Sequence, residues 1–564
     1  MKRYTFIIIL LCAVLSLNAQ PRQELRAVWL TTLEGLDWPS TKGTSASIER
    51  RQKQELCEIL DKLKRANVNT VLFQARIRGT VTYPSKYEPW DGCISGKFGT
   101  APNYDPLQFA IEETHKRGME LHAWVVTVPT GKWESYGAKN LRKRRPDLMK
   151  RIGVDAFLNP ENAQTANYIS NICEEITSRY DIDGIHLDYI RYPEQWTGSL
   201  NRSQGRENIT RIVRAIHTKV KAQKPWVKLS CSPLGKFDDL TRFPSGGWNA
   251  YNKVCQDAQG WLREGLMDQL YPMMYYDGKH FYPFAANWSE NLHGREVAAG
   301  LGIYRLLRSE GNWSLDAIKR QMNVARQLEL GHCYFRCRFL TDNTKGLYDF
   351  VCDFDAYPAL VPAVITRQPV PQAPKSLFVE RTTNGDNISW SGAFDTSDGD
   401  YLTYNVYAST TQPVDIQDAR NLIATRQMQQ FVSVRRSSNE PTLYYAVTAV
   451  NRYGKESEPV GGQRAKGKGQ KSTINDQWSK GIEQETQPTD QLMVNNGYLL
   501  TIPEDKMLPE AEHLAVFSMQ GNIIITKPFA RSVNISDIPN GVYELCTLNR
   551  KGDTHRIGFF LIKR

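Results

Sequence analysis

Short apolar strands alternate with amphipathic helical stretches along the first two thirds of the chain. Apolar residues at spacings of three and four predict helices between the strands, for example over residues 47–68 and 162–182. Eight strands joined by seven helical connections over some 340 residues are the pattern of a (β/α)8 barrel. A doubly wound sheet is the alternative, but no Gly-rich phosphate loop follows the first strand. The predicted strands begin at Arg26, Thr70, Glu120, Gly184, Lys228, Asp268, Ala298 and Gly331.

The pattern changes after residue 363. A proline-rich stretch predicts a stiff linker, and residues 373–460 then show only short alternating strands. Residues 461–491 are polar, basic and then acidic, which predicts a disordered linker. Residues 492–564 read as another small β module. The predicted fold class is therefore α/β, with a (β/α)8 TIM-like barrel over residues 24–363 followed by two small all-β modules.

The N-terminus has the composition of a secretory signal peptide. A basic start precedes an apolar run over residues 6–17 and small residues that end at Ala19. The run is too short to span a bilayer, and no later segment is apolar enough to do so. We therefore expect a signal peptide over residues 1–19, no transmembrane span and an exported mature protein.

Charge and cysteine usage exclude several classes of protein. The net charge of +11 is spread thinly, and the basic run over residues 463–472 has no interleaved aromatic residues, so no nucleic-acid partner is expected. Weak attraction to an anionic polymer or surface stays open. Nine cysteines remain besides Cys12, and Cys333 and Cys337 lack a histidine cluster beside them. No metal or organic cofactor is expected, whereas one or two disulfides are possible.

Candidate chemistry gathers at the predicted strand ends, which converge on one face of such a barrel. Asp188 ends the fourth strand, with His186 one pleat below it on the same side, and Arg191 enters the following loop. Carboxylates among arginines, tyrosines and tryptophans suit a site that binds a sugar polymer and cleaves its glycosidic bond. Further strand-end candidates are Trp29, Glu34, Asp37, Trp38, Gln74, Arg76, Arg78, His122, Trp124, Tyr271, Met273, Tyr275, Tyr276, Asp277, Arg336 and Arg338.

Hydrolysis needs a proton donor and a second group that attacks, activates water or orients the substrate. Asp188 and Asp277 are predicted to share these catalytic roles, and which of them is the acid stays open. Either Glu34 or Asp37 is an alternative to Asp277, since an Asp before Gly278 also suits a simple turn.

The predicted substrate-binding residues have separate tasks. Arg76 and Arg191 would hold a carboxylate ionised or grip an anionic sugar group, and Tyr276 would stabilise positive charge in the transition state. Trp124 would form the floor of the sugar site, and His186 would support Asp188. The predicted set is His186, Arg191, Tyr276, Arg76, Trp124, Asp37 and Trp38.

Several motifs carry a family resemblance. "RAVWLTT", "VLFQAR", "PNYDPLQFAIEETHKRGMELHAW" and "YDIDGIHLDYIRYP" occur in the order seen in the glycosyl-hydrolase-like family 10 barrel of bacterial envelope proteins, which the chain resembles over residues 24–361. The resemblance implies glycoside hydrolysis, and some relatives act on peptidoglycan glycan strands. A weaker likeness to family 18 chitinases breaks at Ile190, where those enzymes carry an acidic residue.

The two all-β parts carry resemblances of their own. Residues 373–460 resemble a fibronectin type III module, and the tail resembles the C-terminal sorting domains of Bacteroidetes export systems. The latter implies an export machinery as partner, and the periplasm or the outer-membrane surface as location. The sequence therefore predicts an exported glycoside hydrolase that acts on a polysaccharide, of peptidoglycan type or another N-acetylated glycan. The alternative is an inactive glycan-binding or adhesive surface protein.

Overall fold

The computed structural model divides the chain into two compact units, Met1–Lys468 and Gly469–Arg564. The predicted signal peptide lies outside the described residues, as does the predicted linker from residue 465 onward. The structure describes residues 20–464 except 197–200, 244, 394, 396–400 and 438–439, and in the second unit residues 499–501, 513–518, 523–528, 530, 532–535, 538, 541–548 and 554–562.

Eight parallel strands close into a barrel in the order β1-β11-β10-β9-β8-β7-β3-β2. This confirms the predicted (β/α)8 architecture. The strands are β1 (Arg26–Leu30), β2 (Thr70–Arg76), β3 (Glu120–Val126), β7 (Gly184–Asp188), β8 (Lys228–Cys231), β9 (Gln269–Leu270), β10 (Glu296–Leu301) and β11 (Gly331–Tyr334).

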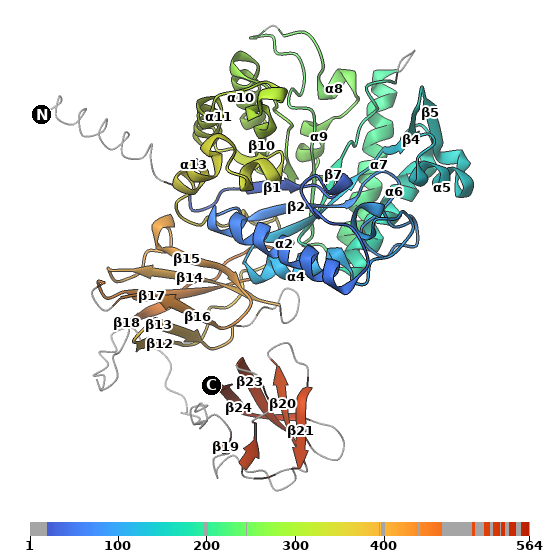
Figure 1. The fold of residues 1–564 in the computed structure, drawn as a ribbon. Coiled ribbons are helices and arrows are strands. Elements are labelled where there is room, and N and C mark those ends of the chain that lie inside the picture. Colours follow the sequence, from blue (N-terminus) through green and yellow to red (C-terminus); the bar gives the residue numbers. More distant parts are fainter. Residues whose placement is uncertain are drawn as a thin grey trace, which may run out of the picture. The chain divides into compact units, whose positions relative to one another are not determined.

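Helices surround this barrel on the outside (Figure 1). Many begin where a polar side chain accepts from a free backbone N–H, as Ser45 does from Ile48 and Asp105 from Leu107. The helices are α2 (Ala46–Arg65), α3 (Gly92–Ser95), α4 (Pro106–Lys116), α5 (Tyr136–Arg144), α6 (Ala163–Arg179), α7 (Arg202–Gln223), α8 (Ala250–Lys253), α9 (Ala258–Arg263), α10 (Tyr282–Ser289), α11 (Leu315–Gln327), α12 (Cys337–Thr341) and α13 (Leu347–Phe354).

Two hydrophobic layers follow from the alternation of side chains along the strands. On β1, Val28 and Leu30 face outward into the large core beneath the helices, while Ala27 and Trp29 face the barrel interior. The interior layer also contains Trp124 and other side chains, so the inside of the barrel is a packed core. Reactive side chains are therefore expected at the strand ends and loops of one end of the barrel.

Two stretches depart from the predicted pattern. The sixth strand was expected to run on from Asp268 into the tyrosines, but β9 ends at Leu270, since Pro272 has no N–H to donate. Between β3 and β7 the chain also forms an unpredicted antiparallel sheet in the order β4-β6-β5, accompanied by α5. Its strands are β4 (Pro129–Lys132), β5 (Met149–Ile152) and β6 (Asp155–Leu158).

A two-sheet sandwich follows the barrel within the same unit. One sheet has the order β12-β13-β16 and the other β15-β14-β17-β18, and their facing sides share a core that includes Trp390 and Tyr445. Strand β18 continues to Arg464, into the stretch predicted to be disordered. The strands are β12 (Leu377–Thr382), β13 (Gly385–Trp390), β14 (Thr403–Ser409), β15 (Leu422–Gln427), β16 (Phe431–Arg435), β17 (Tyr444–Val450) and β18 (Val460–Arg464).

An arginine joins the sandwich to the amino-terminal ends of the barrel strands. Arg426 on β15 pairs through Nη1 with Glu120 at 2.9 Å and through Nη2 with Asp183 at 2.5 Å. The same acidic groups also meet Lys228 at 2.6 Å and His115 at 2.7 Å. Burial raises the pKa of Glu120, but Lys228 and Arg426 outweigh burial and bring that pKa down to about 2. A barrel carboxylate therefore depends on a side chain from the sandwich.

The second unit contains a four-stranded sheet in the order β21-β20-β23-β24 and a two-stranded pair, β19-β22. Buried Val516 and Leu545 contribute to its interior. The strands are β19 (Leu499–Thr501), β20 (His513–Ser518), β21 (Ile523–Pro528), β22 (Ser532–Asn534), β23 (Gly541–Leu548) and β24 (Thr554–Ile562).

Within the described part of the chain, all nine cysteines are free thiols. The one or two disulfides that the sequence allowed are therefore not formed among the described residues, and most of the thiols are buried as small core side chains. None of the helices that the structure describes has the length and apolarity needed to cross a membrane.

Candidate active site

Asp188 ends β7 at the carboxyl-terminal mouth of the barrel and is held by its neighbours from several sides. Its Oδ1 accepts from the backbone N–H of Tyr189 and from Ser232 Oγ, both at 2.8 Å, and its Oδ2 accepts from Trp124 Nε1 at 3.2 Å. Only 7% of the residue is exposed. Burial raises the pKa of the Asp188 carboxyl above its ordinary value, although Arg191 and these three hydrogen bonds counteract it. A carboxyl that keeps its proton to higher pH suits a proton donor.

The residue after Asp188 has a strained backbone. Tyr189 adopts a left-handed conformation with φ of 53°, which a residue with a large side chain rarely does, and the residue stays 38% exposed. Arg191 lies over that ring at 4.2 Å and binds Glu194 through Nη2 at 2.8 Å. Its Nη1 is buried without a partner among the described residues. The loop therefore presents one aromatic face at the mouth and holds a positive charge behind it.

His186 lies one layer deeper and does not bond to Asp188 as expected. Its Nε2 accepts from Trp29 Nε1 at 3.1 Å, and its Nδ1 lies 3.0 Å from Ser230 Oγ. Burial lowers the pKa of His186 well below its ordinary value, and neighbouring His122 adds to the effect. The imidazole is neutral and fully buried, so it packs the barrel interior instead of contacting a substrate.

Two predicted substrate-binding residues, Arg76 and Trp38, are buried behind the mouth of the barrel. Arg76 pairs with Glu88 through Nη2 at 2.6 Å and through Nε at 2.7 Å, and it is almost fully buried. Trp38 is fully buried against Phe73, and its Nε1 donates to the carbonyl of Gln52 at 2.8 Å. Neither side chain is brought to the surface where a sugar would bind.

Asp37 links the loop after β1 to the loop after β11. Its Oδ1 accepts from Arg336 Nη1 at 2.6 Å and from the backbone N–H of Arg338 at 2.9 Å, and its Oδ2 accepts from the N–H of Thr31 at 2.9 Å. Burial raises the pKa of Asp37, while Arg336 counteracts it. These contacts fasten two loops across the seam between the first and last barrel strands.

The loop after β9 brings an aromatic group near Asp188 that the predicted site did not include. Tyr275 stacks on Phe335 with ring centroids 5.2 Å apart. Burial raises the pKa of Tyr275 well above its ordinary value, and the charge of Asp188 adds to this. The phenol therefore stays neutral beside the acid. The signal was present in the sequence, since Tyr275 was among the strand-end candidates, but nothing there distinguished it from Tyr276.

Tyr276 and Asp277 follow in the same loop. The Tyr276 carbonyl accepts from Gln321 at 2.8 Å, and burial raises the pKa of the Tyr276 phenol. Asp277 is exposed, and its Oδ1 accepts from the N–H of Gly278 at 2.7 Å, which caps the short helix Gly278–His280. No hydrogen bond or ion pair in the described part of the chain joins Asp277 to Asp188.

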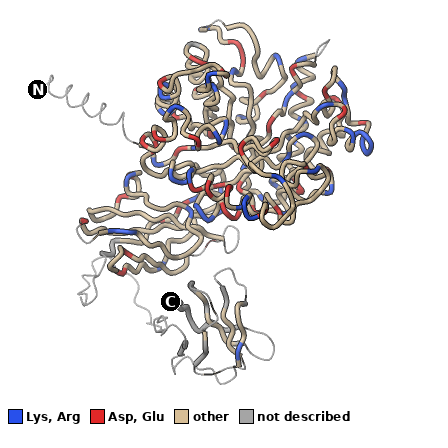
Figure 2. The backbone as a smooth tube through the Cα atoms, viewed as in Figure 1, with Lys and Arg blue, Asp and Glu red and all other residues tan. Residues whose placement is uncertain are grey.

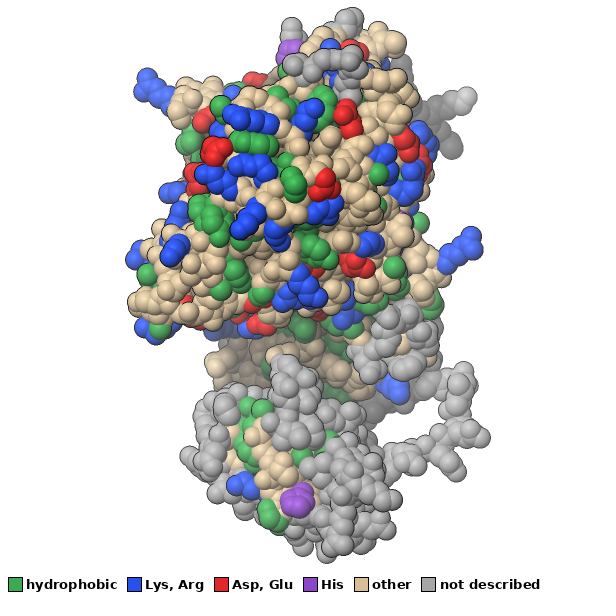
Figure 3. All heavy atoms as spheres, turned by 90° about the vertical axis from the view of Figure 1, so that its right-hand side faces the viewer, with side chains coloured by type: hydrophobic (Ala, Val, Ile, Leu, Met, Phe, Trp, Pro, Cys, Tyr) green, Lys and Arg blue, Asp and Glu red, His purple; other side chains and the backbone are tan. Residues whose placement is uncertain are grey.

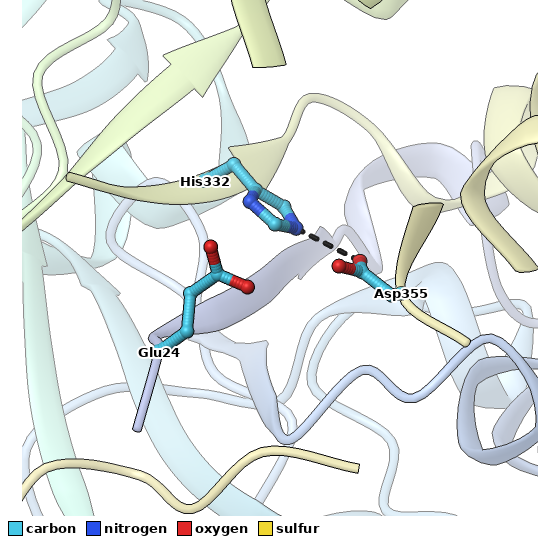
Figure 4. Close-up of side chains that lie close together, drawn as sticks. All are labelled: Glu24, His332 and Asp355. Carbon is cyan, nitrogen blue, oxygen red and sulfur yellow. Dashed lines mark hydrogen bonds and ion pairs between the residues drawn. The ribbon is translucent and has the colours of Figure 1, made fainter. Parts of the chain in front are cut away.

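A possible cation site lies at the other end of the barrel (Figure 4). Glu24, His332 and Asp355 are buried, and one ligand atom from each lies within 4.8 Å of the others. Arg326 already donates to Glu24 and to Asp355, both at 2.6 Å, and Arg26 donates to Glu24 at 2.7 Å. Burial raises the pKa of the Glu24 carboxyl, but the arginines and His332 outweigh burial and lower it. Two guanidinium groups neutralise the carboxylates, so these residues do not fit a metal ion.

Removing the Ser232 hydroxyl is expected to shift the pH dependence of kcat/KM toward alkaline values. Ser232 stabilises the ionised form of Asp188, so Ser232→Ala raises the pKa of Asp188 further. A proton donor acts only while protonated, so the alkaline limb of kcat/KM should move up by about one pH unit. The matched control is Ser230→Ala, which touches His186 instead. An alkaline limb that stays in place or moves down in Ser232→Ala would contradict this role.

The closed parallel barrel and similarity to curated glycosyl hydrolases place the protein in the class of glycoside hydrolases. The glycosyl hydrolase YngK of Bacillus subtilis is 29% identical over 484 residues, covering 78% of this chain and 93% of its own length. The glycosyl hydrolase DigH of Escherichia coli K12 is 32% identical over 353 residues, covering 54% of this chain and 80% of its own length. The chain belongs to the glycosyl hydrolase-like 10 family, whose model matches residues 24–304.

The chain is also similar to two solved structures. The PgaB (BpsB) glycoside hydrolase domain from Bordetella bronchiseptica is 13% identical with a TM-score of 0.41, and the match covers 58% of this chain and 98% of that one. The endo-β-1,4-mannanase from Thermotoga petrophila is 10% identical with a TM-score of 0.39, and the match covers 80% of this chain and 99% of that one.

Proposed function

We propose that the protein is an exported glycosidase that cleaves an N-acetylated glycan of peptidoglycan type, with Asp188 as the proton donor. The observation that carries this proposal is the Asp188 carboxyl, buried at a barrel strand end with a raised pKa and fixed by three hydrogen bonds. Tyr189 offers an exposed aromatic face beside it for a sugar ring, and Tyr275 a neutral phenol.

Asp277 takes the second role in this proposal. It is exposed at the end of the β9 loop, and the single described hydrogen bond of its carboxylate, from the N–H of Gly278 to Oδ1, leaves Oδ2 free to attack or to activate water. Arg191 supplies fixed positive charge near Asp188, which limits how far burial raises the pKa of that acid.

The remaining parts of the chain fit the same proposal. The two-sheet sandwich serves as a fibronectin type III-like module, and the C-terminal sheet serves as a sorting domain read by an export machinery. Residues 1–19 act as the signal peptide, so the mature enzyme works in the periplasm or at the outer-membrane surface.

The direct test is the release of reducing ends by the mature protein. Peptide-free peptidoglycan glycan and chitin oligomers should both be cleaved, whereas a mannan, which has no acetamido groups, should not. Asp277→Asn should lower kcat about a hundredfold or more on the cleaved glycans, since the second carboxylate is then missing. Binding of the glycans without any release of reducing ends would favour the inactive glycan-binding protein instead.

A further inference from the structure

The segment between β3 and α6 forms a strongly basic projection beside the mouth of the barrel. We call residues 129–158, which comprise β4, α5, β5 and β6, the arm. It carries eight Lys and Arg residues against three Asp and Glu. Blue segments cluster along α5 in Figure 2, and the side of the molecule that carries α5 and β5 shows many Lys and Arg side chains in Figure 3. Such a concentration of like charge attracts an anionic partner.

The acidic residues of the arm do not neutralise this charge. Asp155 pairs with Lys132 at 2.8 Å, Glu134 with Lys139 at 3.1 Å, and Asp147 with Arg145 at 2.8 Å. Half-buried Arg142 also lies 4.0 Å from Glu134. The other four basic residues are exposed, and no carboxylate of the described residues pairs with any of them. They are Lys143, Arg144, Lys150 and Arg151.

Exposed aromatic rings accompany these charges. Tyr136 at the start of α5 stacks on Phe98 with ring centroids 5.5 Å apart, and the two residues remain 42% and 49% exposed. Trp133 lies beneath the guanidinium groups of Arg142 and Arg151, at 4.3 and 5.5 Å. Flat apolar faces beside positive groups suit a polymer of sugar rings that carry anionic substituents.

The residues that lead into the arm contact Asp188. Thr127, two residues before β4, donates its N–H and its hydroxyl to the Asp188 carbonyl at 2.9 and 2.8 Å. On the other side, Lys150 lies 5.3 Å from the ring of Trp196, in the loop that follows β7. A chain bound along the arm is therefore led toward the candidate acid.

We infer that the arm binds an anionic glycan strand, one with carboxylates on its sugars, and directs it toward the barrel mouth. This inference rests on the proposed function, because it assigns the charge of the substrate at that same site. Neutral glycan does not account for four exposed cations that no carboxylate of the described residues neutralises. A membrane with anionic headgroups is the competing partner, and the test below separates it.

The test compares binding by the full mature protein in an Asp188→Asn background, so that the glycan stays intact. The arm variant combines Lys143→Gln, Arg144→Gln, Lys150→Gln and Arg151→Gln. The control variant removes the same number of exposed charges from outer helices through Arg50→Gln, Arg51→Gln, Arg263→Gln and Arg320→Gln. The probes are peptide-free peptidoglycan glycan, the same glycan with its carboxyls reduced to alcohols, and phosphatidylglycerol vesicles, each in co-sedimentation.

The arm variant should bind the anionic glycan about tenfold more weakly at low salt, while the control variant keeps the parent's Kd. The parent should bind the carboxyl-reduced glycan as weakly as the arm variant does, and salt should weaken the parent's binding to the anionic glycan. Equal binding of both glycans by the parent, equal losses in the two variants, or a loss confined to vesicles would overturn the inference. Absence of hydrolysis by the protein with Asp188 intact overturns the proposed function separately.

Discussion

Asp188→Asn is expected to lower kcat on the cleaved glycan about a thousandfold, within the range that general acid catalysis contributes. Asparagine keeps the shape of the side chain and an acceptor for Ser232, but it has no proton to give to the leaving oxygen. The barrel core is unchanged, so the far-ultraviolet circular dichroism spectrum should match that of the parent. The release of reducing ends under saturating substrate measures the effect.

Activity on two types of substrate distinguishes the role of Asp188 from that of Asp277. An aryl glycoside with a good leaving group needs little protonation, so Asp188→Asn should recover most of its activity on that substrate, whereas Asp277→Asn should not. Asp316→Asn on the outer face of α11 is the matched control, since its side chain is 72% exposed. Full activity of Asp188→Asn on the natural glycan would assign the proton donor elsewhere.

Arg426→Met is expected to destabilise the first unit by about 3 kcal/mol, because it removes charged hydrogen bonds from Glu120 and Asp183, which keep Lys228 and His115 as ion-pair partners. The Glu120 side chain is 2% exposed and that of Asp183 is 14% exposed, and Arg426 is the contact that the sandwich makes with each of them. Methionine retains the apolar stem of the side chain, so the loss reports on charge. Thermal and urea unfolding of the mature protein measure it.

Two further variants test whether the loss of stability comes from the charge of Arg426. Arg420→Met removes an arginine of the same sandwich whose side chain is 71% exposed, and it should leave the unfolding midpoint unchanged. Arg426→Lys should recover part of the stability, since one ammonium group replaces a fork that reaches two carboxylates. A midpoint for Arg426→Met equal to that of the parent would show that the ion pairs of Arg426 do not stabilise this unit.

The regular parts of this protein follow from its hydrophobic pattern. The eight barrel strands start close to the predicted residues, because alternation and strand-end polarity are local properties. The same rule placed Asp188 at the mouth, and the structure shows it buried there with a raised pKa. The strands β4, β5 and β6 were missed because four residues are too few to show a clear alternation of apolar and polar positions.

Contacts between distant residues explain the other differences. Arg76 stands at a strand end, but Glu88, twelve residues later, draws it into a buried pair. His186 faces inward as expected, yet alternation alone does not reveal that Trp29 and Ser230 would occupy both of its nitrogens. The sequence around Arg426 did not indicate its ion pairs, because Asp183 and Glu120 lie 243 and 306 residues earlier in the chain.

The nine free thiols make the rate of folding important for the proposed export. Burial raises the pKa of Cys231, Cys333 and Cys337 well above the ordinary value, so little thiolate exists in the folded barrel and oxidation there is slow. Outside the cytoplasm an unfolded chain has no such protection, and random pairing of its thiols would compete with closure of the barrel. The chain must bury its cysteines faster than the compartment oxidises them, so mispaired disulfides should accumulate when folding is slowed after translocation.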